Sequence, residues 1–346
     1  MKAMVYTEPG GLEVIEPITL PMPEPARGEV RVRVVASALN HLDLWVRRGM
    51  PDIPPSFPHV GGCDMSGVID AVGEEVHGWA VGDRVVINPT LSCGQCEWCR
   101  RGEDPLCNDF AILGEHRWGG FAEYVVVPAL NLERVPAHIS LVEAAAAPLV
   151  YATAWRMLIT QAAIRPGETV LVIGAGGGVN SAAIQIARLA GCEVWATTSS
   201  AEKMEAAKAL GADFVLNYVE DEAWGRTIYQ RSGKRGVDVV VDNVGSASWA
   251  TSLRSLAKGG RLVTVGATTG PLAETDIRQI FWKQLHLIGS TMSTRGEFSA
   301  VMRLIWQGKL RPVIDRVIPL ADLRAGHELL EGGNQFGKIV VQVGEE

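Results

Sequence analysis

The sequence predicts an α/β protein whose first part is mostly β and whose middle part is a doubly wound parallel sheet. Three observations lead to this fold class. Residues 1 to about 135 alternate short β-rich runs with turn signals, strands and helices alternate from Thr169 onward, and a glycine-rich turn joins the first of those strands to a helix. A chain of 346 residues is long enough for two domains.

The first domain is predicted at residues 1–150. Its strands are indicated by the runs VRVRVVASAL, DMSGVIDAVG, GDRVVINP and FAEYVVVP. After Pro136 the pattern changes, because SLVEAAAAPLVYATAWRMLI has the small residues and the spacing of packed helices.

The second domain is predicted at residues 151–290. Six short runs rich in β-branched residues predict its strands, namely TVLVIGA, EVWATTS, FVLNY, VDVVVDNV, RLVTVGA and LHLIGST. Helical segments at 179–190 and 201–210 lie between them, so βαβ units and a parallel sheet follow. Residues 291–346 hold one helix and two short strands, RVIPL and GKIVVQV, and we expect this segment to return to the first domain.

Composition excludes several classes of function. A net charge of −7 argues against a nucleic-acid-binding surface. The longest apolar stretch, 139–155, is interrupted by Glu143 and Pro148 and is shorter than the ~20 apolar residues of a membrane span. The first strand-like run begins almost at Met1, which leaves no room for a signal segment. We therefore expect a soluble cytoplasmic protein that acts on a small molecule, without a nucleic-acid or membrane partner.

Four of the six cysteines lie in a short lobe at about residues 90–110. In CGQCEWCRRGEDPLC, Cys93, Cys96, Cys99 and Cys107 are separated by two, two and seven residues. Four thiolates fit a closed tetrahedral zinc site, which stiffens a loop and does no chemistry. An iron–sulfur cluster also takes four cysteines, but no proline follows the last cysteine and the lobe precedes a dinucleotide-type fold, so zinc is the preferred interpretation.

This lobe, the preceding GCDMSGVIDAVGEEVHGWAVGDRVV and the following strand–glycine–helix unit resemble the medium-chain dehydrogenase/reductase superfamily of zinc alcohol dehydrogenases and quinone oxidoreductases. The resemblance covers nearly the whole chain. It implies a GroES-like catalytic domain, a Rossmann domain and a substrate cleft between them. It also implies a homodimer or homotetramer, in which LHLIGST pairs as an edge strand across a dimer.

The segment VLVIGAGGGVNSAAIQIARLAG predicts a pyrophosphate-binding turn. The candidate residues are Gly174, Gly176, Gly177 and Gly178, followed by Val179. Asn180 stands where the family has its final glycine, and we expect it to loosen the strand–helix contact or the phosphate grip. Further cofactor contacts are expected from Val244, Gly266 and Ala267 in the later strand segments.

The end of the second strand of this unit indicates NADP(H) rather than NAD(H). A carboxylate there would accept hydrogen bonds from the free ribose hydroxyls of NAD. The chain has ATTSSAEK instead, with hydroxyls at Thr198 and Ser199 and a cation at Lys203. Tyr218, in the pair Asn217–Tyr218, resembles a phosphate-side element of quinone reductases.

The residues at the family's catalytic-zinc positions differ from zinc alcohol dehydrogenases. The three positions hold Asn40, Cys63 with Asp64, and Tyr151, so only the middle pair is suited to zinc, as a weak second site. By resemblance to quinone and enone reductases, Asn40 lies near the nicotinamide and Asp43 orders the loop. His41 takes the place of a residue that often faces the pyrophosphate.

Two residues are candidate hydrogen-bond donors to the substrate, Tyr151 and His116, and Tyr151 is alternatively a pocket wall. His59, after Pro58, is interpreted as a surface or hydrogen-bonding residue rather than a ligand.

The sequence thus predicts an NAD(P)H-dependent oxidoreductase that transfers a hydride to or from a carbonyl, quinone or enone without catalytic zinc. Two alternatives stay open. One is a zinc-dependent alcohol dehydrogenase with an altered ligand set, and the other is a non-catalytic NADPH-binding protein.

Overall fold

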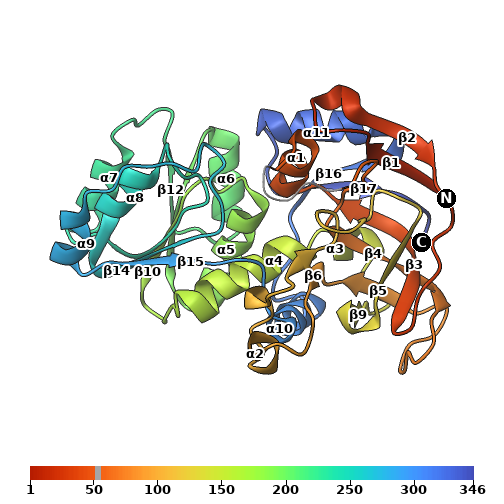
Figure 1. Cartoon of the computed structure of the whole chain (residues 1–346). Helices are drawn as coiled ribbons and strands as arrows, with labels where there is room; N and C mark the ends of the chain where they lie inside the picture. Colours follow the sequence, from red (N-terminus) through yellow and green to blue (C-terminus); the bar gives the residue numbers. More distant parts are fainter. Residues whose placement is uncertain (51–55) are drawn as a thin grey trace. The chain divides into compact units, whose positions relative to one another are not determined.

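The computed structural model describes residues 1–50 and 56–346. Its contacts divide the chain into two compact units (Figure 1). The first unit holds residues 1–149 and 293–346, and the second holds residues 150–292. The C-terminal segment therefore belongs to the same unit as the N-terminal part.

The first unit is built on a seven-stranded, mostly antiparallel sheet. The strand order is β16-β17-β3-β4-β5-β9, and β8 pairs with β3 beside this path. The strands are β3 (Glu29–Ala38), β4 (Asp64–Val72), β5 (Arg84–Ile87), β8 (Tyr124–Pro128), β9 (Leu132–Arg134), β16 (Ile314–Pro319) and β17 (Lys338–Gln342). Two short sheets join β1 (Lys2–Tyr6) to β2 (Ile15–Thr19) and β6 (Thr90–Leu91) to β7 (Ala111–Ile112).

Alternating valines explain the central strand of this sheet. Val30, Val32 and Val34 of β3 are buried and pack in one apolar cluster with residues of β4, β5 and β8. The helices of the unit are α1 (His41–Arg48), α2 (Glu97–Arg100), α3 (Leu141–Ala145), α10 (Arg295–Trp306) and α11 (Leu323–Gly332).

The second unit is a six-stranded parallel sheet in the order β12-β11-β10-β13-β14-β15. Numbered along the chain from β10, this is the 3-2-1-4-5-6 order of the doubly wound dinucleotide fold. The strands are β10 (Thr169–Val172), β11 (Glu193–Thr198), β12 (Phe214–Asn217), β13 (Val237–Val241), β14 (Leu256–Thr264) and β15 (His286–Gly289). All six predicted strands are confirmed.

The helices of the second unit connect these strands as crossovers. They are α5 (Gly178–Leu189), α6 (Ala201–Ala209), α7 (Trp224–Arg231), α8 (Trp249–Ser255) and α9 (Ile277–Lys283), and α4 (Pro148–Trp155) leads into the unit. The strand order reverses between β10 and β13, and ligands of such sheets bind at the carboxyl ends of the strands at that point.

Candidate functional site

A glycine-rich turn joins β10 to α5 at the carboxyl end of the parallel sheet. Gly174 has a φ of +78°, a left-handed conformation that glycine adopts without strain. Gly177 is the N-cap of α5 and offers no side chain to the first-turn N–H groups, which favour an anion. The predicted residues Gly174, Gly176, Gly177, Gly178 and Val179 are half-buried in this turn. The turn fits the pyrophosphate of a dinucleotide.

Asn180 connects β10 to α5, although the sequence predicted that it would loosen the contact between them. Its side-chain N–H groups donate to the carbonyl oxygens of Ile173 and Gly174, both at 2.8 Å. Its Oδ1 accepts a hydrogen bond from the amide of Asn243 at 2.9 Å, and the Asn243 Oδ1 accepts from the Val265 N–H at 3.0 Å. The predicted loosening of the strand–helix contact is wrong. The buried side-chain amide of Asn180 links α5 to the end of β10 by hydrogen bonds, where a glycine would allow close packing of the two backbones.

The carboxyl end of β11 presents hydroxyl groups. The Thr197 Oγ1 accepts a hydrogen bond from the N–H of Gly174 in the turn at 3.1 Å. Thr198 is buried, Ser199 is half-buried, and the Thr198 carbonyl accepts from the N–H of the exposed Tyr218 at 2.9 Å. Lys203 is half-buried in the first turn of α6.

A hollow of about 410 Å³ opens beside the end of β14. Its walls include the predicted cofactor residues Gly266 and Ala267, and Val244 lies half-buried just after β13. The remaining walls come from ten residues, namely Gly245, Ser246, Trp249, Thr264, Val265, Gly270, Pro271, Ala273, Thr275 and Ser290. All of these residues belong to the second unit.

In the first unit, a lysine ammonium lies between Asn40 and Asp64. The Lys338 Nζ donates to the Asn40 Oδ1 at 2.5 Å and to the Asp64 Oδ2 at 2.8 Å. The Asn40 amide also donates to the Asp64 Oδ2 at 2.9 Å, and the other carboxylate oxygen accepts from the Leu149 N–H at 2.7 Å. All three side chains are buried. The adjacent strands β17, β3 and β4 bring them together, since Ala38 pairs with both Val340 and Asp64.

This arrangement does not fit a second metal site on Cys63 and Asp64. Both Asp64 oxygens are already engaged, and burial together with nearby carboxylates raises the pKa of the Cys63 thiol. Among the described residues, the four cysteines of the lobe are the only group of three or more metal-binding side chains close enough to share an ion.

Asp43 holds two loops of the first unit together. Its carboxylate accepts from the N–H of Asn40 at 2.7 Å and from the N–H of Gly62 at 2.9 Å. Burial raises the pKa of Asp43 to about 7, although these N–H groups act in the opposite direction. His41, next to Asn40, is half-buried against Trp45, and burial lowers its pKa.

Glu115 and His116 lie close together in the loop after β7, where Glu115 is buried, His116 is half-buried and the His116 Nδ1 is 3.8 Å from the Glu115 Oε2. The His116 Nδ1 accepts a hydrogen bond from the Ile112 N–H at 3.1 Å, so in the neutral ring the proton is on Nε2. Burial lowers the pKa of His116, which favours this neutral donor. The Glu115 Oε2 is buried without a hydrogen-bond partner in the described residues, and burial raises the pKa of this carboxyl to about 7.

Two other predicted positions are internal to the fold. Tyr151 is buried, and its hydroxyl accepts a hydrogen bond from the Gln185 amide at 2.7 Å. His59 is buried rather than on the surface, and its Nε2 lies 3.0 Å from the Gly114 carbonyl.

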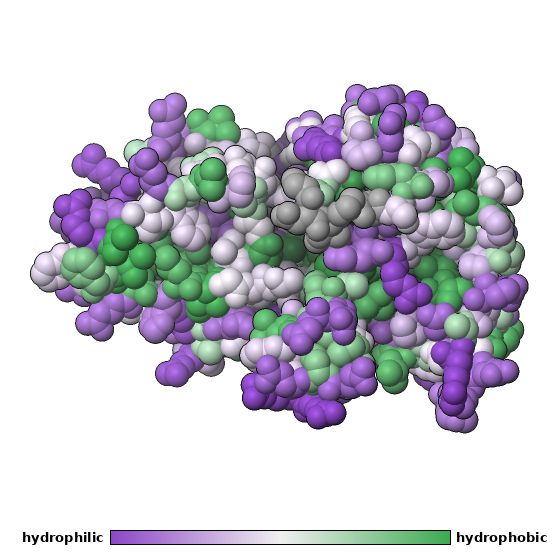
Figure 2. All heavy atoms as spheres, viewed as in Figure 1, coloured by the Kyte–Doolittle hydropathy of each residue, from purple (hydrophilic) through white to green (hydrophobic). Residues whose placement is uncertain are grey.

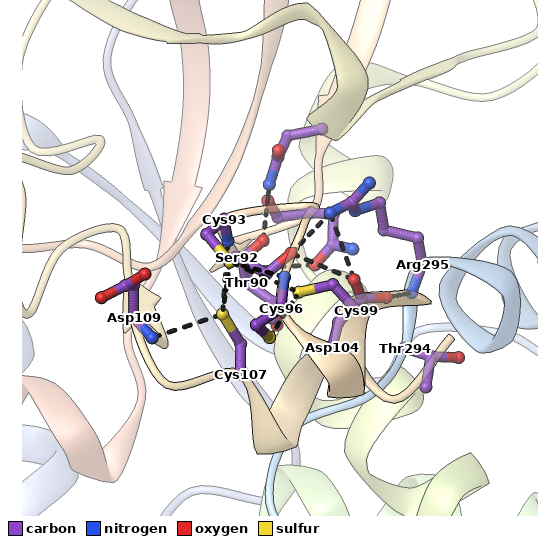
Figure 3. Close-up of polar contacts among 12 residues, drawn as sticks. Thr90, Ser92, Cys93, Cys96, Cys99, Asp104, Cys107, Asp109, Thr294 and Arg295 are labelled. Carbon is purple, nitrogen blue, oxygen red and sulfur yellow. Dashed lines mark hydrogen bonds and ion pairs between the residues drawn. The ribbon is translucent and has the colours of Figure 1, made fainter. Parts of the chain in front are cut away.

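The four cysteines of the lobe converge on one point (Figure 3). Their sulfur atoms lie within 4.8 Å of one another, with separations of 3.5 Å for Cys96–Cys99 and for Cys93–Cys107 and 3.9 Å for Cys93–Cys99. Zn–S bonds of about 2.3 Å in a tetrahedron place sulfurs ~3.8 Å apart. Backbone N–H groups point at the sulfurs of Cys93 and Cys107, as they do around thiolates. The donor set fits zinc.

The lobe is attached to the N-terminus of α10 by a polar cluster (Figure 3). The buried Asp104 carboxylate accepts from the Arg295 N–H at 3.0 Å and pairs with its guanidinium at 3.1 Å. The Ser92 hydroxyl donates to the same carboxylate at 3.0 Å. Loss of the lobe would therefore also disturb α10.

Sequence reasoning missed Lys338, Glu115, Asn243 and Asp104. Lys338 and Asn243 lay within the predicted runs GKIVVQV and VDVVVDNV, but nothing local marks them as partners of Asn40 or Asn180. Glu115 directly precedes His116, which was predicted as a candidate donor to the substrate. The signal that could have indicated Glu115 is an acidic residue in an apolar loop.

No helix among the described residues is long and apolar enough to cross a bilayer.

Comparisons with known proteins agree with this geometry. Residues 26–137 match the model of the alcohol dehydrogenase GroES-like domain, and residues 178–307 match that of the zinc-binding dehydrogenases. The chain is 34% identical over 322 residues to the acryloyl-coenzyme A reductase of Metallosphaera sedula, covering 92% of this chain and 93% of that protein.

Two solved structures are similar along the whole chain. A crystal structure of an NAD-dependent alcohol dehydrogenase is 48% identical with a TM-score of 0.95, covering 99% of this chain and 100% of that one. A crotonyl-CoA carboxylase/reductase in complex with NADP is 27% identical with a TM-score of 0.92, covering 100% and 95%. The chain therefore belongs to the medium-chain dehydrogenase/reductase superfamily and is an NAD(P)-dependent oxidoreductase.

Proposed function

We propose that this enzyme reduces a carbonyl-conjugated alkene, a quinone or an aldehyde with NADPH, and that no catalytic zinc takes part. The observation that carries the proposal is the Lys338 ammonium, which is bonded to both Asn40 and Asp64. These two residues stand at family zinc positions, and a buried cation already neutralises the carboxylate there. A metal ion at the same place would have to displace Lys338 and would meet an amide where the family has a thiolate.

When bound, the dinucleotide supplies the hydride. The chain's own contribution is to hold the substrate carbonyl and to stabilise the negative charge that develops on its oxygen. The His116 Nε2–H is our proposed donor, because its Nδ1 is fixed as an acceptor by the Ile112 N–H. Charge on an enolate or a hydroquinone spreads over several atoms, so hydrogen bonds suffice where a simple alcohol would need a metal.

The names of two relatives favour conjugated acceptors. The relative of Metallosphaera sedula is an acryloyl-coenzyme A reductase, and a quinone oxidoreductase of Lama guanicoe is 31% identical over 99% of this chain. The 48% identical solved structure is an alcohol dehydrogenase, and it supports the rival function with an altered zinc ligand set.

Metal content and chelation distinguish the two functions. We expect one zinc per chain, and NADPH-dependent reduction of an enoyl thioester or benzoquinone that survives dialysis against a chelator of loosely held metal. The measurement combines elemental analysis with steady-state rates before and after dialysis, and benzyl alcohol oxidation serves as the control reaction. Two zincs per chain, with alcohol oxidation lost on chelation and restored by zinc, would contradict the proposal.

We further propose a preference for NADPH over NADH, because the end of β11 carries hydroxyl groups in place of a carboxylate. Thr198→Asp should lower the NADPH/NADH ratio of kcat/KM by about tenfold or more, since the new charge repels the 2′-phosphate and accepts from a free 2′-hydroxyl. Thr198→Asn is the matched neutral control and should change the ratio little. A wild-type enzyme that uses NADH as well as NADPH would refute the preference.

We propose that the chain forms a homodimer or homotetramer through the open edge of its parallel sheet. β15 ends the strand order, and Leu287 within it is 38% exposed. Apolar side chains gather on the visible face over α9 and β15 (Figure 2). Within α9, Trp282 is 74% and Phe281 58% exposed. Unpaired edges and apolar patches of this kind are typical of interfaces.

Sedimentation equilibrium should give two or four chains, and Ile288→Lys should shift the protein toward monomers. A monomeric wild type would contradict this.

We also propose that Cys93, Cys96, Cys99 and Cys107 hold one structural zinc, because their sulfur atoms lie within 4.8 Å of one another.

A further inference from the structure

Two asparagines bridge the point at which the strand order of the parallel sheet reverses. Asn180 is in the first turn of α5, just beyond β10, and Asn243 follows β13. β10 and β13 are neighbours in the sheet, but β10 leads to β11 on one side and β13 leads to β14 on the other. A dinucleotide lies across the crevice at such a reversal, so the Asn180–Asn243 hydrogen bond of 2.9 Å joins its two sides.

On the β10 side, Asn180 is fixed to the pyrophosphate turn. It is 6% exposed, and both N–H groups of its amide are used by the carbonyls of Ile173 and Gly174. A Cβ placed on Gly174 or Gly177 would lie 3.7 or 3.5 Å from its Nδ2, so this amide fills the space beneath the turn.

On the β13 side, Asn243 is fixed to the loop after β14. Its Oδ1 accepts from the Val265 N–H at 3.0 Å, and its carbonyl accepts from the Thr268 N–H at 3.3 Å. Between these two contacts lie Gly266 and Ala267, which wall the 410 Å³ hollow. One chain of hydrogen bonds therefore runs from the pyrophosphate turn to the wall of the hollow.

We propose that Asn180 and Asn243 are positioning residues that fix the spacing between the pyrophosphate turn and the loop after β14. They set this spacing before the cofactor arrives, so a ligand that spans both sides binds without the cost of ordering them. A ligand that reaches only the turn and β11 gains little from the bridge. With glycine at position 180, as the family pattern has it, the bridge would be missing.

The test compares a spanning ligand with a fragment of it in the intact protein. Dissociation constants for NADPH and for 2′-phospho-ADP-ribose, which lacks the nicotinamide, are measured by calorimetry for wild type, Asn243→Ala, Asn180→Gly and the double variant. We expect each single variant to bind NADPH about tenfold more weakly, a typical size for one lost link of this kind. With Asn243→Ala, which keeps the contacts of Asn180 to Ile173 and Gly174, the fragment should lose less than about threefold. Asn180→Gly also removes those two contacts, so it should weaken fragment binding more, and the double variant should be little worse than Asn180→Gly because the bridge is already absent.

Asn131→Ala is the matched control. Asn131 is also a buried asparagine whose amide donates to two carbonyls, those of Asn88 and Thr90, both at 2.7 Å, but it lies in the first unit. It should lower the melting temperature without changing either dissociation constant.

Two results would overturn the proposal. One is an equal loss of affinity for NADPH and for the fragment in Asn243→Ala, which would make the pair a local support of the turn. The other is a lower melting temperature with unchanged affinities, which would make it structural only. If Asn243→Ala does not fold, Asn243→Ser decides between the same outcomes.

Discussion

Cys99→Ser should release the zinc of the cysteine lobe and lower the melting temperature by ten degrees or so. Four sulfurs within 4.8 Å of one another are a compact donor set, and the free energy of binding a structural zinc contributes directly to folding. Loss of ~3 kcal/mol from a domain of about 200 residues lowers Tm by ~6–12 °C. The effect should extend beyond the lobe, because Asp104 connects it to the N-terminus of α10.

The measurement is elemental analysis together with a thermal unfolding scan of purified variants. Cys192→Ser is the control, since Cys192 is a buried cysteine outside the cluster, and it should keep one zinc per chain. A Cys99→Ser enzyme that retains both its zinc and its melting temperature would show that the four cysteines do not form a structural metal site.

Lys338→Met should destabilise the first unit by about 3–5 kcal/mol, the usual cost of leaving one partner of a buried ion pair alone. Asp64 is fully buried, and among the described residues its carboxylate would keep the Asn40 amide and the Leu149 N–H as partners without the ammonium. Desolvation of an unpaired charge is the physical cause, so the loss should depend on the charge of residue 64.

Asp64→Asn in the Lys338→Met background provides the check. The neutral amide needs no cation, so the double variant should recover part of the stability that the single variant loses, as measured by denaturant unfolding. If Lys338→Met unfolds at the wild-type denaturant concentration, the ammonium does not compensate Asp64, and the main support for a metal-free catalytic centre is lost.

Local patterns were enough to predict the second unit's strands and the cysteine lobe. A strand that is buried on both faces needs a run of apolar residues such as VDVVVDNV. The cysteines of this zinc-type cluster are closely spaced in the sequence. Both features can therefore be recognised within a few residues. The glycine turn is readable for the same reason, since a strand, a tight turn and a helix follow one another directly.

Asn180 shows the limit of reading a motif by its consensus. The missing glycine was visible, and its expected effect was a looser strand–helix contact or a looser phosphate grip. The actual effect depends on acceptors at Ile173 and Gly174 and on a donor at Asn243, which is 63 residues away. A hydrogen-bond partner at that distance in sequence is chosen by the order of the strands.

By itself, the sequence determined the two kinds of sheet, the glycine-rich turn between β10 and α5 and the four-cysteine cluster, because each follows from residues that are neighbours in the chain. The tertiary structure alone decided what stands at the family's zinc position. Lys338 lies 298 residues from Asn40 and 274 from Asp64, and it meets them only because β17 pairs with β3, which pairs with β4. Because Asp64 is buried, its carboxylate is removed from water and requires a compensating charge, which Lys338 supplies. The burial of Asp64 is known only once the fold is known.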